Sequence, residues 1–178
     1  MPALGEDLPP TLRASMLVRV LAYDRRMGHR PPPLTLAVVH RQGDAKSEHQ
    51  GQELSGALEV AARGKSIAGR PLRVVRIGFS DTNQLQTELT QAQAVALYAC
   101  EGLESASESI AQVTRRLSVL SIAGSEAQVN QGLAIGLSRK GNSPVILVHL
   151  SAARAEGADL DAGLLSLSRL VEPGKGAR

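Results

Sequence analysis

The chain has 178 residues, of which 43% are hydrophobic, 21% charged and only 2% aromatic, so leucine, valine, isoleucine and alanine must fill its core. Its net charge of +3 is small for nucleic-acid binding, which needs several cations on one face and often aromatic side chains for stacking. The single cysteine excludes an intramolecular disulfide, and no apolar run approaches the roughly twenty residues of a membrane span.

Helices and strands are predicted to alternate over the first two thirds of the chain. Residues 1–10 are rich in proline and glycine and predict a flexible tail, and an amphipathic helix is expected over 11–27, ended by Gly28 and three prolines. A polar loop is expected at 40–51. Strands are predicted at 34–39, 72–77, 94–99 and 117–122, and the helices between them carry Leu54 to Ala61, Leu85 and Leu89, and Ile110 and Val113.

The C-terminal third has a different pattern. Two apolar segments, 133–138 and 145–150, flank a loop with Gly and Asn, which predicts a β-hairpin. A helical turn at 151–155, a final amphipathic helix at 163–171 and a flexible tail at 172–178 complete the chain. The predicted fold class is α/β: one domain over 11–171, a three-layer sandwich with a mostly parallel sheet, crossover helices, and a C-terminal hairpin plus helix.

Two motifs that suggest chemistry have simpler structural interpretations. The segment 136–143 has the spacing of a phosphate-binding loop, but Asn142 stands where the lysine belongs and Pro144 opens a strand, so it predicts a hairpin turn. Cys100 follows an apolar strand, where α/β proteins often place functional groups, but the neighbouring Glu101 disfavours a thiolate. We expect a half-buried structural cysteine.

The remaining titratable residues form no recognisable catalytic or metal-binding pattern. The four histidines lack metal-ligand spacing, and no Gly-x-Ser-x-Gly elbow occurs. Three acidic residues share one predicted helical face, where they suit the dipole of a helix start. These residues are His29, His40, His49 and His149, and Glu101, Glu104 and Glu108. The sequence predicts no catalytic residue, no cofactor and no metal.

The order of segments resembles a known family. The resemblance is carried by Arg13–Leu17 in the first helix, the Gly-Arg-Pro turn within Lys65–Leu72, the hairpin of 132–137 and 145–149, and the closing segments 150–160 and 164–171. Together these are similar to the YfiR-like family of small, usually periplasmic bacterial proteins, and the resemblance covers about residues 11–171.

The resemblance implies a non-enzymatic regulator. Such proteins are compact α/β sandwiches that often dimerise, and they restrain a membrane-anchored diguanylate cyclase or accompany a sensor kinase, which affects cyclic-di-GMP output. It therefore implies a periplasmic, homodimeric signalling regulator with no nucleic-acid partner. The contact residues expected on the first helix are Met16, Val20, Tyr23 and Met27. Core packing explains the same four residues equally well.

A second function stays open at the level of sequence. The chain can instead be a cytoplasmic α/β domain that binds a nucleotide or another small ligand, in a cleft near Arg41, Phe79 and Cys100 at the ends of the strands. The N-terminal residues have neither the basic nor the apolar region of a signal peptide. The protein is therefore expected to be either cytoplasmic, or periplasmic with its signal removed.

Overall fold

The computed structural model of the chain describes residues 8–172 and contains one eight-stranded sheet. Its helices are α1 (Pro10–Ala22), α2 (Ala45–Ala62), α3 (Thr82–Ala92), α4 (Ser107–Leu117), α5 (Glu126–Asn130), α6 (Leu150–Ala155) and α7 (Ala162–Leu167), with 3-10 turns η1 (Arg25–His29) and η2 (Glu104–Ala106). Its strands are β1 (Leu34–Arg41), β2 (Ser66–Ile67), β3 (Arg70–Phe79), β4 (Ala94–Ala99), β5 (Leu120–Ala123), β6 (Ile135–Lys140), β7 (Ser143–Val148) and β8 (Ser168–Leu170).

The sheet is mostly parallel. Its strand order is β2-β3-β1-β4-β5-β6-β7-β8, and the five strands from β3 to β6 run parallel. The hairpin of β6 and β7 is antiparallel, and β8 adds to β7 in parallel. The α/β class, the parallel sheet with crossover helices and the C-terminal hairpin are therefore confirmed.

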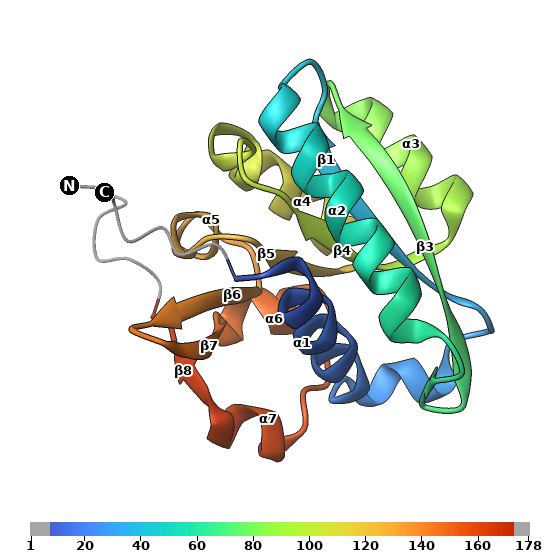
Figure 1. Cartoon of the computed structure of the whole chain (residues 1–178), viewed down its shortest axis with the longest axis vertical. Helices are drawn as coiled ribbons and strands as arrows, with labels where there is room; N and C mark the ends of the chain where they lie inside the picture. The colour runs from blue at the N-terminus through green and yellow to red at the C-terminus, as the bar shows by residue number, and fades with distance from the viewer. Residues whose placement is uncertain (1–7, 173–178) are drawn as a thin grey trace.

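Helices cover both faces of the sheet, as Figure 1 shows for α1 and α2 on one side and α3 on the other. One core cluster joins the sheet to α1 and α2 through residues such as Leu17 and Leu58, and the second joins it to α3 and α4 through Leu85 and Ile110. β1 and β4 lie in the middle of the sheet, and every residue of β4 is buried. Their continuous apolar runs follow from burial on both faces.

Caps and turns fix where the elements begin and end. Asp44 accepts hydrogen bonds from Lys46 and Ser47 N–H at the start of α2, and Asp81 accepts one from Gln84 N–H at the start of α3. Helix α3 ends at Gln93, which adopts the left-handed conformation with φ of 53°.

Several predicted boundaries were wrong in the first half of the chain. The first helix ends at Ala22, and a 3-10 turn follows, because the Asp24 side chain caps a new turn at Arg26 N–H. The polar loop predicted at 40–51 ends at Asp44, which caps α2. Residues 45–51 are therefore helical. Of the predicted tail 1–10, residues 1–7 lie outside the described residues. The last three residues are not a flexible tail, because Leu8 is buried and Pro10 begins α1.

The C-terminal third also differs from the prediction. Helix α5 was missed because it has only five residues, although Ser125 and Gln128 form a capping box at its start. The predicted final helix 163–171 stops at Leu167, and the next three residues form β8, because the open edge of β7 offers backbone partners. Of the predicted tail 172–178, residues 173–178 lie outside the described residues.

Candidate functional site

The main candidate site lies where the chain changes direction across the sheet. From β1 the crossover runs through α2 to β3, whereas from β4 it runs through α4 to β5, so the loops after β1 and β4 leave toward opposite faces. A crevice forms at such a switch point in open α/β sheets. Here a cavity of about 480 Å³ lies beside these loops, and its lining residues are Arg41, Gln42, Phe79, Ser80, Leu103, Ser105 and Ala106.

Arg41 connects the two loops across this crevice. Its Nη1 donates to the Gly102 carbonyl at 3.1 Å and to Ser105 Oγ at 3.4 Å, while its backbone N–H donates to Ser47 Oγ at 2.8 Å. The side chain is exposed, so its guanidinium has donors left for an anionic group. Phe79 supplies an apolar wall. The cavity therefore offers a cation, hydroxyl groups and one aromatic ring.

The structure brings Arg41 and Phe79 together, as the ligand-binding alternative expects, but it does not bring Cys100 to the cavity. Cys100 has no exposed surface, which corrects the expectation of a half-buried residue. Its burial raises the pKa of the thiol to about 12, so the thiol stays protonated at neutral pH. Its carbonyl accepts a hydrogen bond from Gln128 Nε2 at 2.9 Å. The role of Cys100 is packing.

A buried charged residue lies on the face of the sheet that α1 and α2 cover. Arg13 of α1 is 3% exposed, and its Nη1 donates to Tyr98 Oη on β4 at 2.6 Å. The guanidinium carbon also lies 5.9 Å from the centre of the Tyr98 ring. Burial raises the pKa of Tyr98, so its hydroxyl keeps its proton. This pair ties α1 to the centre of the sheet.

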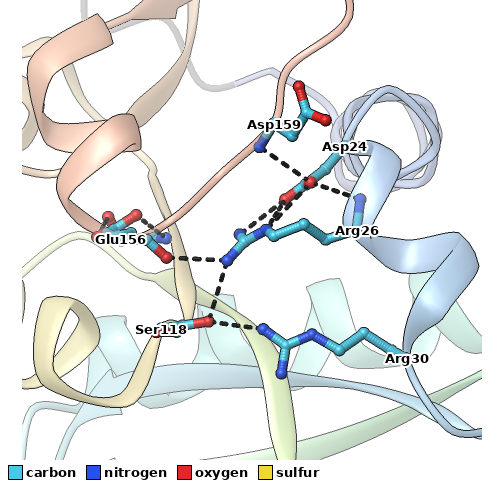
Figure 2. A network of polar contacts seen from close by, with 7 residues as sticks. Asp24, Arg26, Arg30, Ser118, Glu156 and Asp159 are labelled. Atoms are coloured by element: carbon cyan, nitrogen blue, oxygen red, sulfur yellow. Dashed lines mark hydrogen bonds and ion pairs between the residues drawn. The ribbon is translucent and has the colours of Figure 1, made fainter.

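A polar network connects η1 with the C-terminal third of the chain, as Figure 2 shows. Asp24 is fully buried and pairs with Arg26 at 2.8 Å. Arg26 Nη1 donates to the carbonyl of Glu156 at 2.9 Å, and the backbone N–H of Asp159 donates to Asp24. Arg30 donates to the Ser118 carbonyl at 3.0 Å. The network joins three separate stretches of the chain, residues 24–30, Ser118 and residues 156–159.

The four residues predicted as a contact surface divide into two groups. Val20 and Met27 have no exposed surface and belong to the core, and Met16 is 9% exposed. Tyr23 is half-buried. Only Met16 and Tyr23 reach a groove of about 360 Å³ between α1, β7 and α7, whose further lining residues are Leu12, Ser15, Arg19, Pro144, Ile146 and Leu167.

The sequence analysis missed the far side of this groove. Leu167 of α7 lines the far side and is 63% exposed, and Leu12 lines the groove from α1 and is 37% exposed. Leu170 on β8 is 55% exposed but is not among the lining residues. The predicted helix 163–171 assigned the two C-terminal leucines to a core-facing stripe. The signal that was available is the pair of serines, Ser166 and Ser168, that interrupts this stripe.

The other sequence candidates occupy structural positions. The segment 136–143 forms β6 and the turn to β7, with Gly141 at φ of 61°. The Glu104 carboxylate accepts a hydrogen bond from Gly102 N–H, and His149 caps α6. Within residues 8–172, no group of three histidine, cysteine or acidic side chains is placed to hold a metal ion. None of the helices described there has the length and apolar character needed to cross a bilayer.

Solved structures with the same architecture include a substrate-binding protein and an ABC domain in complex with L-Trp. The substrate-binding protein CD0873 of Clostridium difficile superposes with a TM-score of 0.63 at 14% identity, over 91% of this chain and 59% of that one. A Streptococcus pneumonia ABC domain in complex with L-Trp superposes with a TM-score of 0.63 at 11% identity, over 89% of this chain and 62% of that one. The chain thus spans about three fifths of each, and the likeness shows the fold alone.

The fold and its switch-point cavity therefore define the chain as an open α/β protein with a mostly parallel sheet. Within it, the family model described as YfiR/HmsC-like matches residues 10–169. The chain belongs to the YfiR/HmsC-like family, which confirms the resemblance. Members of this family are periplasmic regulators of cyclic-di-GMP signalling and not enzymes. A search of curated protein sequences finds no match.

Proposed function

We propose that this chain is a non-enzymatic periplasmic regulator that binds and restrains a membrane-anchored signalling protein, either a diguanylate cyclase or a sensor kinase. The observation that carries the proposal is the family model, which matches nearly the whole of the described domain, residues 10–169. The partner is held in one state, and a signal that shifts the regulator releases it. We also propose that the chain forms a homodimer.

The groove between α1 and α7 supports this binding role. It contains two of the four predicted contact residues, Met16 and Tyr23, and two exposed leucines, Leu12 and Leu167. Exposed apolar groups gathered at one groove are typical of protein-binding surfaces. We propose that the partner or the second copy contacts the chain here.

The test is capture of a partner from the membranes of the native host by the purified chain, followed by an activity assay. The expected result is a membrane protein with a cyclase or kinase domain, whose activity falls when the chain is added. The variant Leu12→Asp/Leu167→Asp is expected to lose both effects. Val60→Asp is the matched control, because Val60 is 62% exposed on α2 and does not line the groove. If the groove variant captures the partner as well as the wild-type chain does, the groove is not the contact surface.

A second candidate function is binding of a nucleotide or another small anionic ligand at the switch-point cavity. Its volume of about 480 Å³ lies within the range of small-molecule sites, roughly 300–1,000 Å³. Arg41 supplies the cation for such a ligand. A thermal-shift screen with nucleotides and small carboxylates tests this function. A ligand that raises the melting temperature of the native chain, but not that of Arg41→Ala, supports ligand binding at this cavity. If no ligand raises the melting temperature, this function is wrong.

A further inference from the structure

The sheet has one long edge that no described strand covers. β3 has ten residues and pairs with β1 along its whole inner side, from Leu72 to Phe79. On the outer side β2 pairs only with Arg70 and Pro71. From Leu72 onward the outer side of β3 therefore has no strand neighbour among the described residues. At the opposite edge of the sheet, β8 has only three residues.

The hydrogen-bond pattern shows which backbone groups face this open edge. The Phe79 carbonyl accepts the N–H of Gln42, the residue that follows β1, at 3.2 Å. Successive residues of a strand direct their N–H and C=O groups to opposite edges. The backbone groups of Phe79 and of every second residue before it therefore point toward β1. Leu72, Val74 and Arg76 then face outward, and each presents an unpaired donor and acceptor.

Both ends of the open stretch are closed. At one end the β2–β3 hairpin covers Arg70 and Pro71. At the other end the Gln84 side chain of α3 donates from Nε2 to the Gly78 carbonyl at 2.8 Å. The free stretch between them is long enough for an added strand of about five residues.

This edge carries positive charge on both faces of the sheet. Arg73 and Arg76 are exposed, and their spacing of three residues places them on opposite faces. Arg63 and Lys65 are exposed at the turn that precedes β2. These four cations form no ion pair with any other described residue. Glu48 lines one hollow together with Arg76, and its carboxylate accepts a hydrogen bond from Gly43 N–H.

The charge decides between possible occupants of the edge. A second copy pairing through its own β3 brings like charges together, which disfavours strand pairing. An extended segment with acidic side chains three residues apart presents them on both faces, opposite Arg73 and Arg76. Between these charges Val74 and Val75 are only half-buried and would be covered.

We propose that the outer edge of β3, from Leu72 to Arg76, accepts an extended acidic segment of a partner protein as an added strand. The inference rests on the proposed function in so far as that segment belongs to the restrained membrane protein. Main-chain hydrogen bonds give such an interaction its affinity, and the arginines select acidic sequences.

The first test uses the full chain and a synthetic ten-residue peptide of threonine and valine with glutamate at every third position. Binding is measured by fluorescence anisotropy and by shifts of backbone amide resonances. We expect the amides of Val74 and Arg76 to shift, and we expect a peptide with lysine in place of glutamate not to bind. Absence of binding by the acidic peptide, or shifts confined to other strands, overturns the proposal.

Two variants separate strand addition from plain charge attraction. Val74→Pro removes an outward N–H without removing a bond to β1, and it is expected to abolish peptide binding while the circular dichroism spectrum is unchanged. Arg73→Glu/Arg76→Glu is expected to weaken binding about tenfold or more. Lys140→Glu/Arg154→Glu is the matched control, with both residues exposed and outside β3, and it is expected to bind normally. Normal binding by Val74→Pro overturns strand addition.

Vesicles of anionic phosphatidylglycerol serve as the competing occupant. Vesicle binding that depends on the two arginines but not on Val74, without peptide binding, overturns the proposal in favour of a lipid surface. Failure of the inference is distinguishable from failure of the proposed function. If the edge variants capture the membrane protein normally, the edge proposal is wrong and the proposed function stands. If the peptide binds the edge but no signalling protein is captured, the edge proposal stands and the proposed function is wrong.

Discussion

Glu156 is a buried acidic residue whose carboxylate is fully enclosed by hydrogen-bond donors. It has no exposed surface, and it accepts hydrogen bonds from Thr114 Oγ1 at 2.6 Å, from Ser121 Oγ at 2.5 Å and from Ser121 N–H at 2.9 Å. Burial nevertheless raises the pKa of Glu156, because the loss of water outweighs these bonds. The residue therefore links the protonation of the chain to its stability.

The sign of this linkage gives a prediction for pH. Because the folded-state pKa lies above the ordinary value of 4.5, the stabilising contribution of Glu156 is complete below about pH 4.5 and is lost as pH rises through the folded-state pKa. Glu156→Gln cannot ionise and should not show this loss. Urea denaturation of both chains from pH 4 to 8 measures it. A stability difference that does not change with pH contradicts the assignment.

Gly124 is required because the Tyr98 hydroxyl lies against it. A Cβ at residue 124 would lie 2.7 Å from Tyr98 Oη and 3.3 Å from the Ala99 carbonyl. We expect Gly124→Ala to destabilise the chain by about 2 kcal/mol, and to cost about 1 kcal/mol less in a Tyr98→Phe background. A double-mutant cycle by urea denaturation tests this. Equal costs in both backgrounds show that the hydroxyl is not the obstacle.

At the scale of elements, η1 is connected to the C-terminal third through Arg26. The Arg26 side chain is 17% exposed and its partner Asp24 is fully buried, so Arg26→Met leaves a buried carboxylate without its cation. We expect a loss of about 3 kcal/mol and faster hydrogen exchange in residues 156–161. Arg25→Met is the matched control, because Arg25 is 58% exposed in its ion pairs and should cost about 0.5 kcal/mol. Equal losses would contradict the role of the network.

The sequence predicted the elements that have long, uniform patterns. Strand β4 at 94–99 matches its prediction, because a continuous apolar run has one interpretation in a central strand. The helix predicted to carry Leu85 and Leu89 is also present, as α3. Strand β8 was not predicted, because it depends on a tertiary contact with the free edge of β7. Helix α2 was predicted, but its start was missed because its first residues form a polar stretch that the Asp44 cap stabilises.

The candidate site was predictable only in part. Arg41 and Phe79 could be placed together, because carboxyl ends of parallel strands meet at one edge of a sheet. The exposure of Leu167 and the burial of Val20 could not be separated by helical spacing alone, since each is one of several regularly spaced apolar residues. The groove between α1, β7 and α7 depends on how these elements lie relative to one another, which no local pattern records.

At the scale of the whole molecule, one eight-stranded α/β sheet and its helices carry three candidate surfaces. The switch-point cavity lies at the carboxyl ends of β1 and β3, the open edge lies along the outer side of β3, and the groove lies between α1, β7 and α7. A regulator that links a signal to the state of a partner needs at least two coupled sites. Three separate surfaces give the proposed regulator room for a signal site and a partner site, and the family to which the chain belongs regulates cyclic-di-GMP signalling.

The most direct test of this account is the cyclic-di-GMP content of the native host with and without the chain. Deletion is expected to raise the level, because the partner cyclase is released. Complementation with the wild-type chain should restore the level, and Leu12→Asp/Leu167→Asp should not restore it despite normal folding. A level that stays unchanged on deletion would contradict the account.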